Sequence, residues 1–333
     1  MNSKFTITSK ILSYVAEIAE LTGGINMAEK INKNPTLRRA NRIQTVHGSL
    51  AIEQNTLSID QVTAVINGKA VIAPPKDIEE VKNAFEIYEM LDTLNPYSVE
   101  DLLKAHGVMM RGLLRDAGCF RQKPVGVVDN QSGEVIHLGT LPAYVPETVE
   151  KLLHWTKTSD FHPLVKSCIF HYEFELIHPF LDGNGRCVRL WHTLILSKWN
   201  AVFAWLPVES MIYRFQEEYY KAINACNVKC DSTEFIEFML AIIKLVLTEA
   251  NQTSEKVAIE KLTDKATGKS QKHFEKLYYV FGTDRIFGRN DVAGICALSY
   301  SAAGKIIVKL KEYELIEAVK GKGKGKYKFK QKI

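Results

Sequence analysis

The segment 178–189 constrains the fold of this chain more than any other. It reads HPFLDGNGRCVR and lies between two apolar stretches with helical spacing, 162–177 and 186–199. Gly183 and Gly185 permit positive φ angles and leave consecutive backbone N–H groups uncovered. At the start of a helix such groups form a nest for an anion, which the helix dipole also favours. The sequence therefore predicts two apolar helices joined by a short anion-binding turn.

The side chains of the same segment suit phosphate chemistry. Arg186 and Arg189 stand three residues apart, so both guanidinium groups project from nearly the same helix face toward phosphate oxygens. Asp182 offers one hard oxygen, the usual protein share of a Mg²⁺ ion that phosphates and water mostly hold. His178 can accept a proton near neutral pH. Each feature alone has an ordinary structural explanation, but their combination favours a nucleotide site.

The segment resembles the motif of the Fic (Fic/Doc) family, HPFx[D/E]GN[G/K]RxxR, at every defined position. The resemblance extends over roughly residues 45–245, with flanking matches at 105–107, in a predicted β-hairpin at 124–139 and at 218–222. It implies a mainly α fold, a Fic-type helical bundle with a small β-hairpin flap. It also implies a protein adenylyltransferase, which transfers AMP from ATP to a Ser, Thr or Tyr hydroxyl of a protein target, the chain itself included among the candidates.

The resemblance implies a role for each residue of the motif. His178 would deprotonate the incoming hydroxyl, and Asp182 would bind Mg²⁺. The phosphates of ATP would be bound by Gly183, Asn184, Gly185, Arg186 and Arg189, the last at the γ-phosphate end. Tyr219 and Asn227 match positions that contact the adenosine half of ATP in relatives.

Gly185 bears on the type of transfer. Family members that phosphorylate their targets tend to carry Lys at the matching position, so Gly185 favours transfer of a nucleotidyl group. A Fic-type phosphotransferase, or a transferase that uses another nucleotide, stays open as an alternative.

Ser49 and Glu53 resemble the family's inhibitory helix motif, [S/T]xxxE[G/N]. The resemblance implies that Glu53 pairs with Arg189 and denies it to the γ-phosphate, so that ATP binds in an unproductive pose. Gln54 departs from the Gly or Asn of the motif, although Asn55 follows it. The alternative is an amphipathic helix with an ordinary surface glutamate, because surface carboxylates are common.

The hairpin at 124–139 resembles the family flap, which adds a strand-like contact to the segment of the target that is modified. Its contact residues would be Leu138, Gly139 and Thr140. The alternative is a plain surface hairpin.

The C-terminal part of the chain is basic. Residues 251–333 hold 18 Lys and Arg against 9 Asp and Glu, a net charge of +9, while the remaining residues carry −4 of the total of +5. Their pattern, with lysines and glycines at 320–326, resembles a winged helix-turn-helix, a common appendage of Fic proteins. Lysines on a wing suit phosphate contacts, which makes DNA a candidate partner. The alternative is a winged fold that contacts protein.

We therefore expect a helical region at 1–95 with an inhibitory helix near 45–58, a catalytic core at 96–250 and a winged helix-turn-helix at 254–333. No apolar run in the sequence reaches the roughly 20 residues that span a bilayer, so we expect a cytoplasmic protein without a membrane partner. A homodimer is a family-level expectation. The rival to an enzyme is a DNA-binding regulator that uses the core as a nucleotide sensor.

Overall fold

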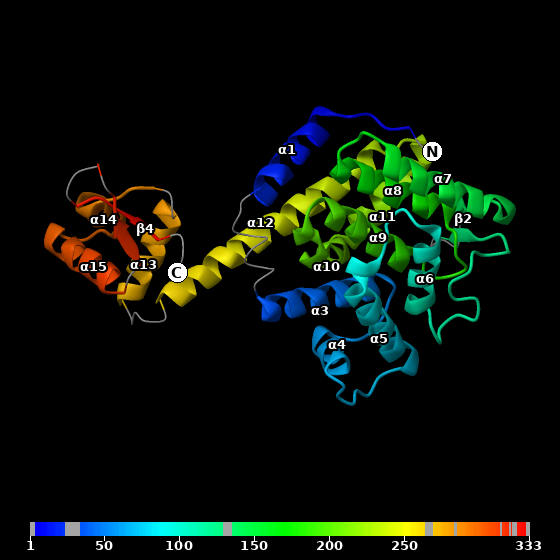
Figure 1. The fold of residues 1–333 in the computed structure, drawn as a ribbon, viewed down its shortest axis with the longest axis horizontal. Coiled ribbons are helices and arrows are strands. Elements are labelled where there is room, and N and C mark those ends of the chain that lie inside the picture. The colour runs from blue at the N-terminus through cyan, green and yellow to red at the C-terminus, as the bar shows by residue number, and fades with distance from the viewer. Residues whose placement is uncertain are drawn as a thin grey trace. The chain divides into compact units, whose positions relative to one another are not determined.

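A computed structural model gives the arrangement of the chain (Figure 1). The structure describes residues 4–23, 34–128, 135–263, 269–282, 285–313, 315–319, 321 and 325–330. They form two compact units, Met1–Ala250 and Asn251–Ile333. The tip of the expected hairpin and most of the lysine-rich stretch at 320–326 lie outside the described residues.

The first unit opens with a helical region. Its elements are α1 (Ser9–Gly23), α3 (Pro35–Ile52), α4 (Ile59–Ile66), α5 (Pro75–Glu89), the 3-10 helix η1 (Leu91–Thr93) and α6 (Val99–Met109). The Asn34 side chain accepts a hydrogen bond from the backbone N–H of Leu37 and thereby caps α3. A capping box between Ser58 and Gln61 fixes the start of α4. Side-chain caps therefore fix the residues at which α3 and α4 begin.

The second half of this unit contains the motif. Its elements are the strands β1 (Gly126–Val128) and β2 (Val135–Leu138), η2 (Pro142–Tyr144), α7 (Val145–Thr158), α8 (Pro163–Ile177), α9 (Asn184–Trp199), η3 (Ala201–Trp205), α10 (Val208–Arg214), α11 (Gln216–Lys229) and the first part of α12 (Thr233–Thr263), which continues past Ala250 into the second unit. The prediction of a helix up to residue 177 is confirmed. The next helix begins at Asn184 and not at Arg186, because Gly183, in the left-handed region, already turns the chain into it.

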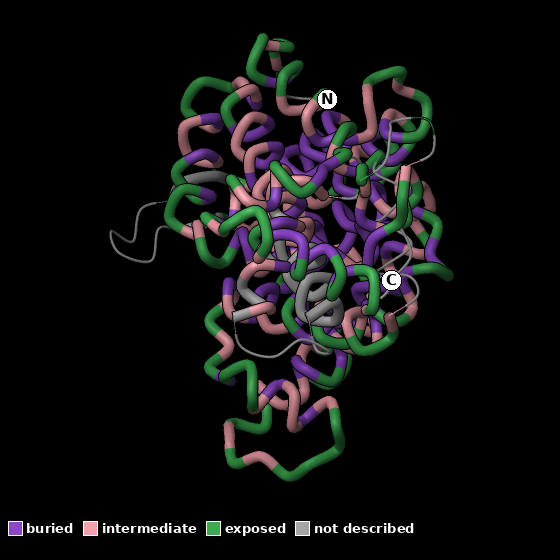
Figure 2. Tube along the Cα trace, turned by 90° about the vertical axis from the view of Figure 1, so that its left-hand side faces the viewer, coloured by how far each residue is buried: buried purple, intermediate pink, exposed green. Residues whose placement is uncertain are grey.

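The helices α8 and α9 lie in the interior of the first unit. Ile169 and Phe170 on α8 and Leu190, Trp191 and Leu194 on α9 are fully buried. Each such side chain stabilises the fold by about 1.5–3 kcal/mol. Buried residues, purple in Figure 2, fill the middle of the unit, and exposed residues lie on its outer turns. The loop between α8 and α9 is thus anchored at both ends in the core.

The helix α3 is packed against α10 at a point of backbone contact. A Cβ atom at Gly48 would lie 2.6 Å from the Cα and N atoms of Ser210, so no larger residue fits there without a backbone shift. Ile43, Val46 and Leu50 of the same helix are buried. The helix is therefore an integral part of the hydrophobic core.

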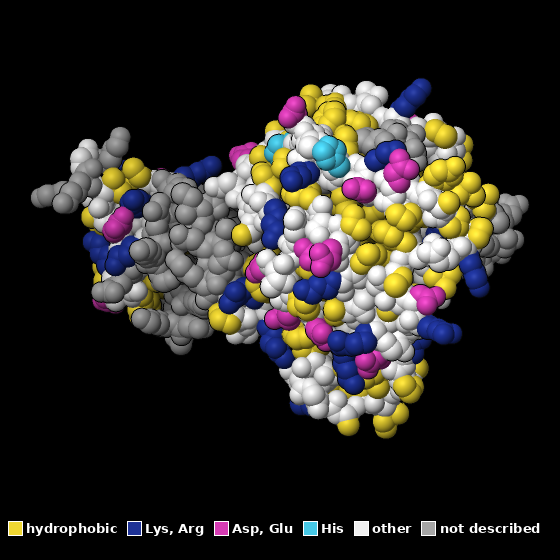
Figure 3. Space-filling model, turned by 45° about the vertical axis from the view of Figure 1, so that its right-hand side comes forward, with side chains coloured by type: hydrophobic (Ala, Val, Ile, Leu, Met, Phe, Trp, Pro, Cys, Tyr) yellow, Lys and Arg dark blue, Asp and Glu magenta, His cyan; other side chains and the backbone are white. Residues whose placement is uncertain are grey.

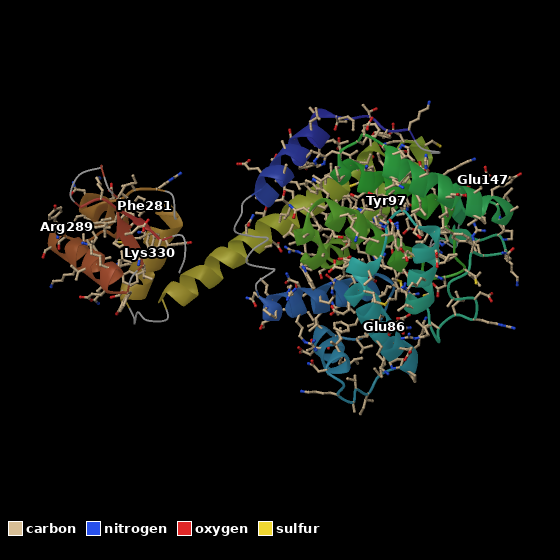
Figure 4. All side chains as sticks on the ribbon, viewed as in Figure 1. Glu86, Tyr97, Glu147, Phe281, Arg289 and Lys330 are labelled. Carbon is tan, nitrogen blue, oxygen red and sulfur yellow. The ribbon has the colours of Figure 1, made fainter. Side chains whose placement is uncertain are left out.

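The second unit has its own small core. It contains α13 (Lys269–Phe281), α14 (Arg289–Cys296), α15 (Tyr300–Glu312), and the antiparallel strands β3 (Ile316–Ala318) and β4 (Tyr327–Phe329), in which Ile316 pairs with Phe329. Phe274, Leu310 and Phe329 belong to one buried cluster. Arg289 lies 4.9 Å from the centre of the Tyr300 ring and joins α14 to α15 (Figure 4). Three helices followed by a two-stranded hairpin are the element order that a winged helix-turn-helix requires, and the assignment of that fold to this unit stays a prediction.

The turn between α14 and α15 bends the chain by 108°. This angle lies in the range of a helix-turn-helix. Among the residues that the structure describes, no single helix is long and apolar enough to cross a membrane, and only this bent pair meets that test by length and composition.

Candidate active site

The loop between α8 and α9 is shaped by two residues with positive φ. His178 ends α8 at φ 51° and ψ 61°, and Gly183 precedes α9 at φ 81°. A non-glycine residue in this region costs about 1–2 kcal/mol, so the surroundings must hold His178 in place. The buried Asn184 side chain closes the loop, since it accepts from the N–H of Phe180 at 2.8 Å and donates to the carbonyl of Phe180 at 2.9 Å. The predicted phosphate contact of Asn184 is therefore left to its backbone N–H.

His106 packs against the loop between α8 and α9. Its ring stacks on Phe180 with the centroids 3.7 Å apart. The N–H of Gly118 donates to Nδ1 at 2.9 Å, so Nε2 carries the proton and donates to the carbonyl of Asp182 at 3.0 Å. Burial lowers the pKa of His106 to about 4. A neutral imidazole therefore fixes the backbone at the candidate metal ligand.

Arg121 joins the flap to the catalytic loop. Its guanidinium donates to the carbonyls of His178 at 2.7 Å and Lys123 at 2.8 Å, and also to the carbonyl of Thr140. The residue is 4% exposed, and burial lowers the pKa of its guanidinium. Nothing in the sequence singles out this arginine, because its partners are carbonyl groups that the fold brings together. Arg121 therefore fixes the position of the hairpin relative to His178.

The predicted flap residues lie beside His178. The N–H of Gly139 donates to the carbonyl of Val125 at 3.1 Å, and that of Thr140 donates to the carbonyl of Ile177 at 3.2 Å. A Cβ atom at Gly139 would lie 3.3 Å from the Cβ of His178. The Leu138 side chain is 70% exposed. The hairpin therefore lies against the loop 178–183, and it exposes the apolar side chain of Leu138 at the end that adjoins this loop.

The predicted inhibitory residues meet Arg189. This arginine donates from Nη2 to Glu53 Oε1 at 2.7 Å and to the carbonyl of Ser49 at 3.0 Å. The exposed fractions of the two side chains are 1% for Arg189 and 29% for Glu53. Burial alone would lower the pKa of Arg189, but the Glu53 carboxylate outweighs this effect and holds the pKa above its ordinary value.

The turn after α3 shows why the motif has Gly or Asn at the position that Gln54 occupies here. Glu53 caps α3, and Gln54 adopts φ 67°, the left-handed region that the Gly or Asn of the motif would favour. Gly185 lies directly against this turn. A Cβ atom there would overlap the Glu53 carboxylate and lie 2.9 Å from Arg189 Nη1. The contact between Glu53 and Arg189 and a side chain at position 185 are thus incompatible in this arrangement.

Arg186 has two carboxylate partners. It donates from Nη1 to Glu80 Oε1 at 3.0 Å, and its Nη2 lies 3.4 Å from Asp182 Oδ1. Arg186 and Glu80 are both buried. Nothing in the sequence singles out Glu80, because a glutamate on an amphipathic helix usually faces water. The ion pair links α5 to the motif.

Asp182 fits a Mg²⁺ ion that arrives with phosphates. Its side chain is 55% exposed, and Oδ1 accepts from the N–H of Gly183 at 2.6 Å. Within the described part of the chain, no group of three or more His, Cys, Asp or Glu side chains could hold a metal ion. One exposed carboxylate matches an ion whose other ligands are phosphate oxygens and water.

Glu175 is a further carboxylate beside the candidate base. Its Oε2 lies 3.8 Å from Nδ1 of His178. Burial raises the pKa of Glu175 to about 7, with the nearby Arg189 lowering it and Glu53 raising it. The residue lies one helical turn before His178, a spacing that sequence reasoning could have used.

The two predicted adenosine contacts lie on α11. Tyr219 is 1% exposed, and its hydroxyl is 2.9 Å from Nε2 of His171. Asn227 accepts from the Tyr172 hydroxyl at 2.7 Å. The next residue, Tyr220, is 44% exposed. The structure therefore gives Tyr219 a core position, and its contact with adenosine stays a prediction.

Comparisons with known proteins agree with this geometry. Residues 96–196 match the model of the Fic/DOC family. A crystal structure of a Fic family protein from Desulfovibrio desulfuricans G20 is 38% identical in sequence, with a TM-score of 0.72, and the match covers 100% of this chain and 99% of that chain. The chain belongs to the Fic family. Fic-1 of C. elegans shares the fold at 21% identity, with a TM-score of 0.61 over 74% of this chain and 72% of that one.

Curated Fic relatives carry the name of an activity. The protein adenylyltransferase fic-1 of Caenorhabditis elegans is 29% identical over 58% of this chain and 38% of its own length. The protein adenylyltransferase Fic of Nematostella vectensis is 29% identical over 59% of this chain and 45% of its own length. The chain thus spans less than half the length of these relatives.

Proposed function

We propose that this Fic protein transfers AMP from ATP to a Ser, Thr or Tyr hydroxyl of a protein and that Glu53 restrains the transfer. The observation that carries the proposal is the loop 178–186, where a candidate base, a half-exposed carboxylate and the N-terminus of α9 surround one turn. The names of the curated relatives support the same chemistry.

His178 acts as the base. It takes the proton of the target hydroxyl, whose oxygen then attacks the α-phosphorus of ATP. A new oxygen–phosphorus bond forms, the bond from the α-phosphorus to the bridging oxygen breaks, and pyrophosphate leaves. Arg121 holds the carbonyl of His178 and that of Thr140, so the flap presents the target segment in register with the base.

Negative charge grows on the phosphate oxygens during this step. The first N–H groups of α9 and the Arg186 guanidinium offer fixed positive dipoles and charge close to the loop. Mg²⁺ bound through Asp182 neutralises phosphate charge when it is present. The core anchors α9, so these groups need little reorganisation.

Glu53 restrains the reaction through Arg189. A γ-phosphate that seeks Arg189 must displace the Glu53 carboxylate from Nη2, where the bond is 2.7 Å long. While the carboxylate stays, the triphosphate is excluded from this arginine and the α-phosphorus is not aligned with the target hydroxyl. Removal of the carboxylate frees the guanidinium for phosphate.

Incubation with labelled ATP tests the proposal. The Glu53→Gly variant, with Mg²⁺ and a cell lysate, should incorporate α-labelled ATP far more than the unaltered chain. The Glu217→Gly variant, which lacks an exposed carboxylate on α11, serves as the control. Incorporation should vanish in the Glu53→Gly, His178→Ala double variant. Label from γ-labelled and not α-labelled ATP would instead indicate a phosphotransferase.

We propose DNA binding by the second unit as a second function. Ser301, Lys305 and Lys309 are exposed on α15, the second helix of the helix-turn-helix. On the face of the first unit in Figure 3, by contrast, basic and acidic side chains are interspersed. We infer that α15 contacts duplex DNA mainly through phosphates.

Fluorescence anisotropy with labelled duplex DNA tests this inference on the full chain. Binding should weaken steeply as salt rises, and Lys305→Glu should reduce both the affinity and the salt slope. Flat, weak binding at low salt would contradict it and leave protein contacts as the role of this unit. The rival function is a DNA-binding regulator without transferase activity. DNA binding, together with the absence of His178-dependent label on any protein, would support it. The homodimer and the cytoplasmic location stay predictions.

A further inference from the structure

Arg186 stands between two carboxylates that differ in distance and exposure. Glu80 Oε1 is 3.0 Å from Nη1 and its side chain is 5% exposed, whereas Asp182 Oδ1 is 3.4 Å from Nη2 and its side chain is 55% exposed. A buried, closer carboxylate attracts a guanidinium more strongly than an exposed one, because water screens the latter. The guanidinium is therefore drawn toward α5 and away from the candidate metal ligand.

Glu80 is itself held from the other side. Asn55 donates from Nδ2 to Glu80 Oε2 at 2.8 Å and to the carbonyl of Asp77 at 3.2 Å. The two oxygens of Glu80 thus have different partners. Oε1 faces Arg186 and also lies 3.9 Å from the exposed Lys76 Nζ, and Oε2 faces Asn55. This arrangement fixes the carboxylate in one orientation.

Asn55 belongs to the turn that carries Glu53. Its N–H donates to the carbonyl of Leu50 at 3.1 Å, and its Oδ1 accepts from the N–H of Leu57 at 3.1 Å. One short turn therefore supplies the carboxylate that pairs with Arg189 and supports the carboxylate that pairs with Arg186.

We propose that Glu80 is a positioning residue of the nucleotide site, which limits the contact of the Arg186 guanidinium with Asp182 and so leaves the Asp182 carboxylate available to Mg²⁺. The inference rests on the proposed function, because it assumes that ATP binds with Mg²⁺ at this loop. It adds a residue that the motif does not contain and gives Asn55 a role besides capping the turn.

The consequence of removing Glu80 follows from the contacts of Arg186. The guanidinium is 4% exposed, so it cannot turn to water, and Asp182 is its other carboxylate partner. Drawn to Asp182, it would place a positive charge against the carboxylate that would bind Mg²⁺. The affinity for the metal should then fall more than the affinity for ATP itself, which keeps its contact with Arg189.

Calorimetric titration of ATP at rising Mg²⁺ concentration tests this, with the Glu53→Gly chain as the parent. In Glu80→Gln the Mg²⁺ concentration for half-maximal ATP binding should rise about tenfold, the lower end of the effect expected for an outer partner of a metal ligand. Asn55→Ala should shift it in the same direction but less. Glu79→Gln, which alters an exposed neighbour on α5, should leave it unchanged.

An unchanged Mg²⁺ requirement in a folded Glu80→Gln variant would overturn the inference. Tighter ATP binding without Mg²⁺ would also overturn it, since Glu80 would then be a competitor of phosphate. If Glu80→Gln does not fold, Glu80→Asp and Asn55→Ala carry the test. A shifted Mg²⁺ requirement without AMP transfer would support the inference and refute the proposed function, whereas absence of ATP binding in the parent would overturn both.

Discussion

Glu53 and Arg189 are 136 residues apart in the chain and meet in a hydrogen-bonded ion pair of 2.7 Å. The arginine is almost completely buried and the glutamate only partly, so water can reach the pair from one side. The pair is therefore strong enough to order the site and accessible enough for a phosphate to exchange with the carboxylate.

The charge of Glu53 should contribute to stability when no nucleotide is bound. Breaking a buried ion pair by removing one partner costs about 3–5 kcal/mol, and partial exposure of Glu53 reduces this to about 1–2 kcal/mol for Glu53→Gln. ATP with Mg²⁺ should restore the loss, because phosphate then pairs with Arg189. Thermal melts with and without ATP measure both effects. An equal ATP-induced shift in the variant and the unaltered chain would contradict this account.

The strain at Gln54 should be removable. Its φ of 67° favours glycine, so Gln54→Gly should raise the free energy of unfolding by about 1 kcal/mol. The same change should tighten the turn and lower the basal incorporation of labelled AMP. Denaturant unfolding and the labelling assay are the measurements, and Gln54→Ala, which keeps a Cβ atom, is the matched control. Equal effects of glycine and alanine would refute the role of backbone strain.

His106 should make stability fall in mild acid. Its folded-state pKa of about 4 lies below the ordinary value of 6.5, so the unfolded chain takes up a proton first as the pH falls. The stabilisation is complete above about pH 6.5 and is lost as the pH falls toward 4, by up to about 3 kcal/mol. Unfolding of His106→Gln across this range should show a smaller pH dependence than the unaltered chain. Parallel pH profiles would disprove the assignment.

Arg121 should matter for the target and not for ATP. Lysine cannot span the carbonyls of His178 and Thr140 at once, so Arg121→Lys should lower kcat for transfer to a protein about 10²-fold. The affinity for ATP should stay within about twofold, since no phosphate contact is altered. Steady-state kinetics and calorimetry separate the two, with the exposed Arg115→Lys as the control. A loss of ATP affinity equal to the loss of kcat would argue against a positioning role.

Sequence patterns predicted contacts where a long apolar stretch or a family motif marks the residues. The helices around 178–189 follow from long apolar stretches, and the meeting of Glu53 with Arg189 follows from two motifs that resemble one family. Glu80 and Arg121 escaped prediction because their partners lie 106 and 57 residues away in the chain and their own neighbours look ordinary. Adjacent tyrosines on α11 show the same limit, since helical spacing alone does not say which ring faces the site.

The packing of α3 limits how the proposed restraint by Glu53 could be released. Detaching the helix would expose Ile43, Val46 and Leu50, at about 1.5–3 kcal/mol each, and would open the backbone contact at Gly48. That sum rivals the whole stability of an ordinary domain, about 5–15 kcal/mol. We therefore expect the proposed restraint to be released by rotation of the Glu53 carboxylate and not by detachment of α3. A regulator of the proposed activity would need to touch only the few residues after α3, which would make the switch local and reversible.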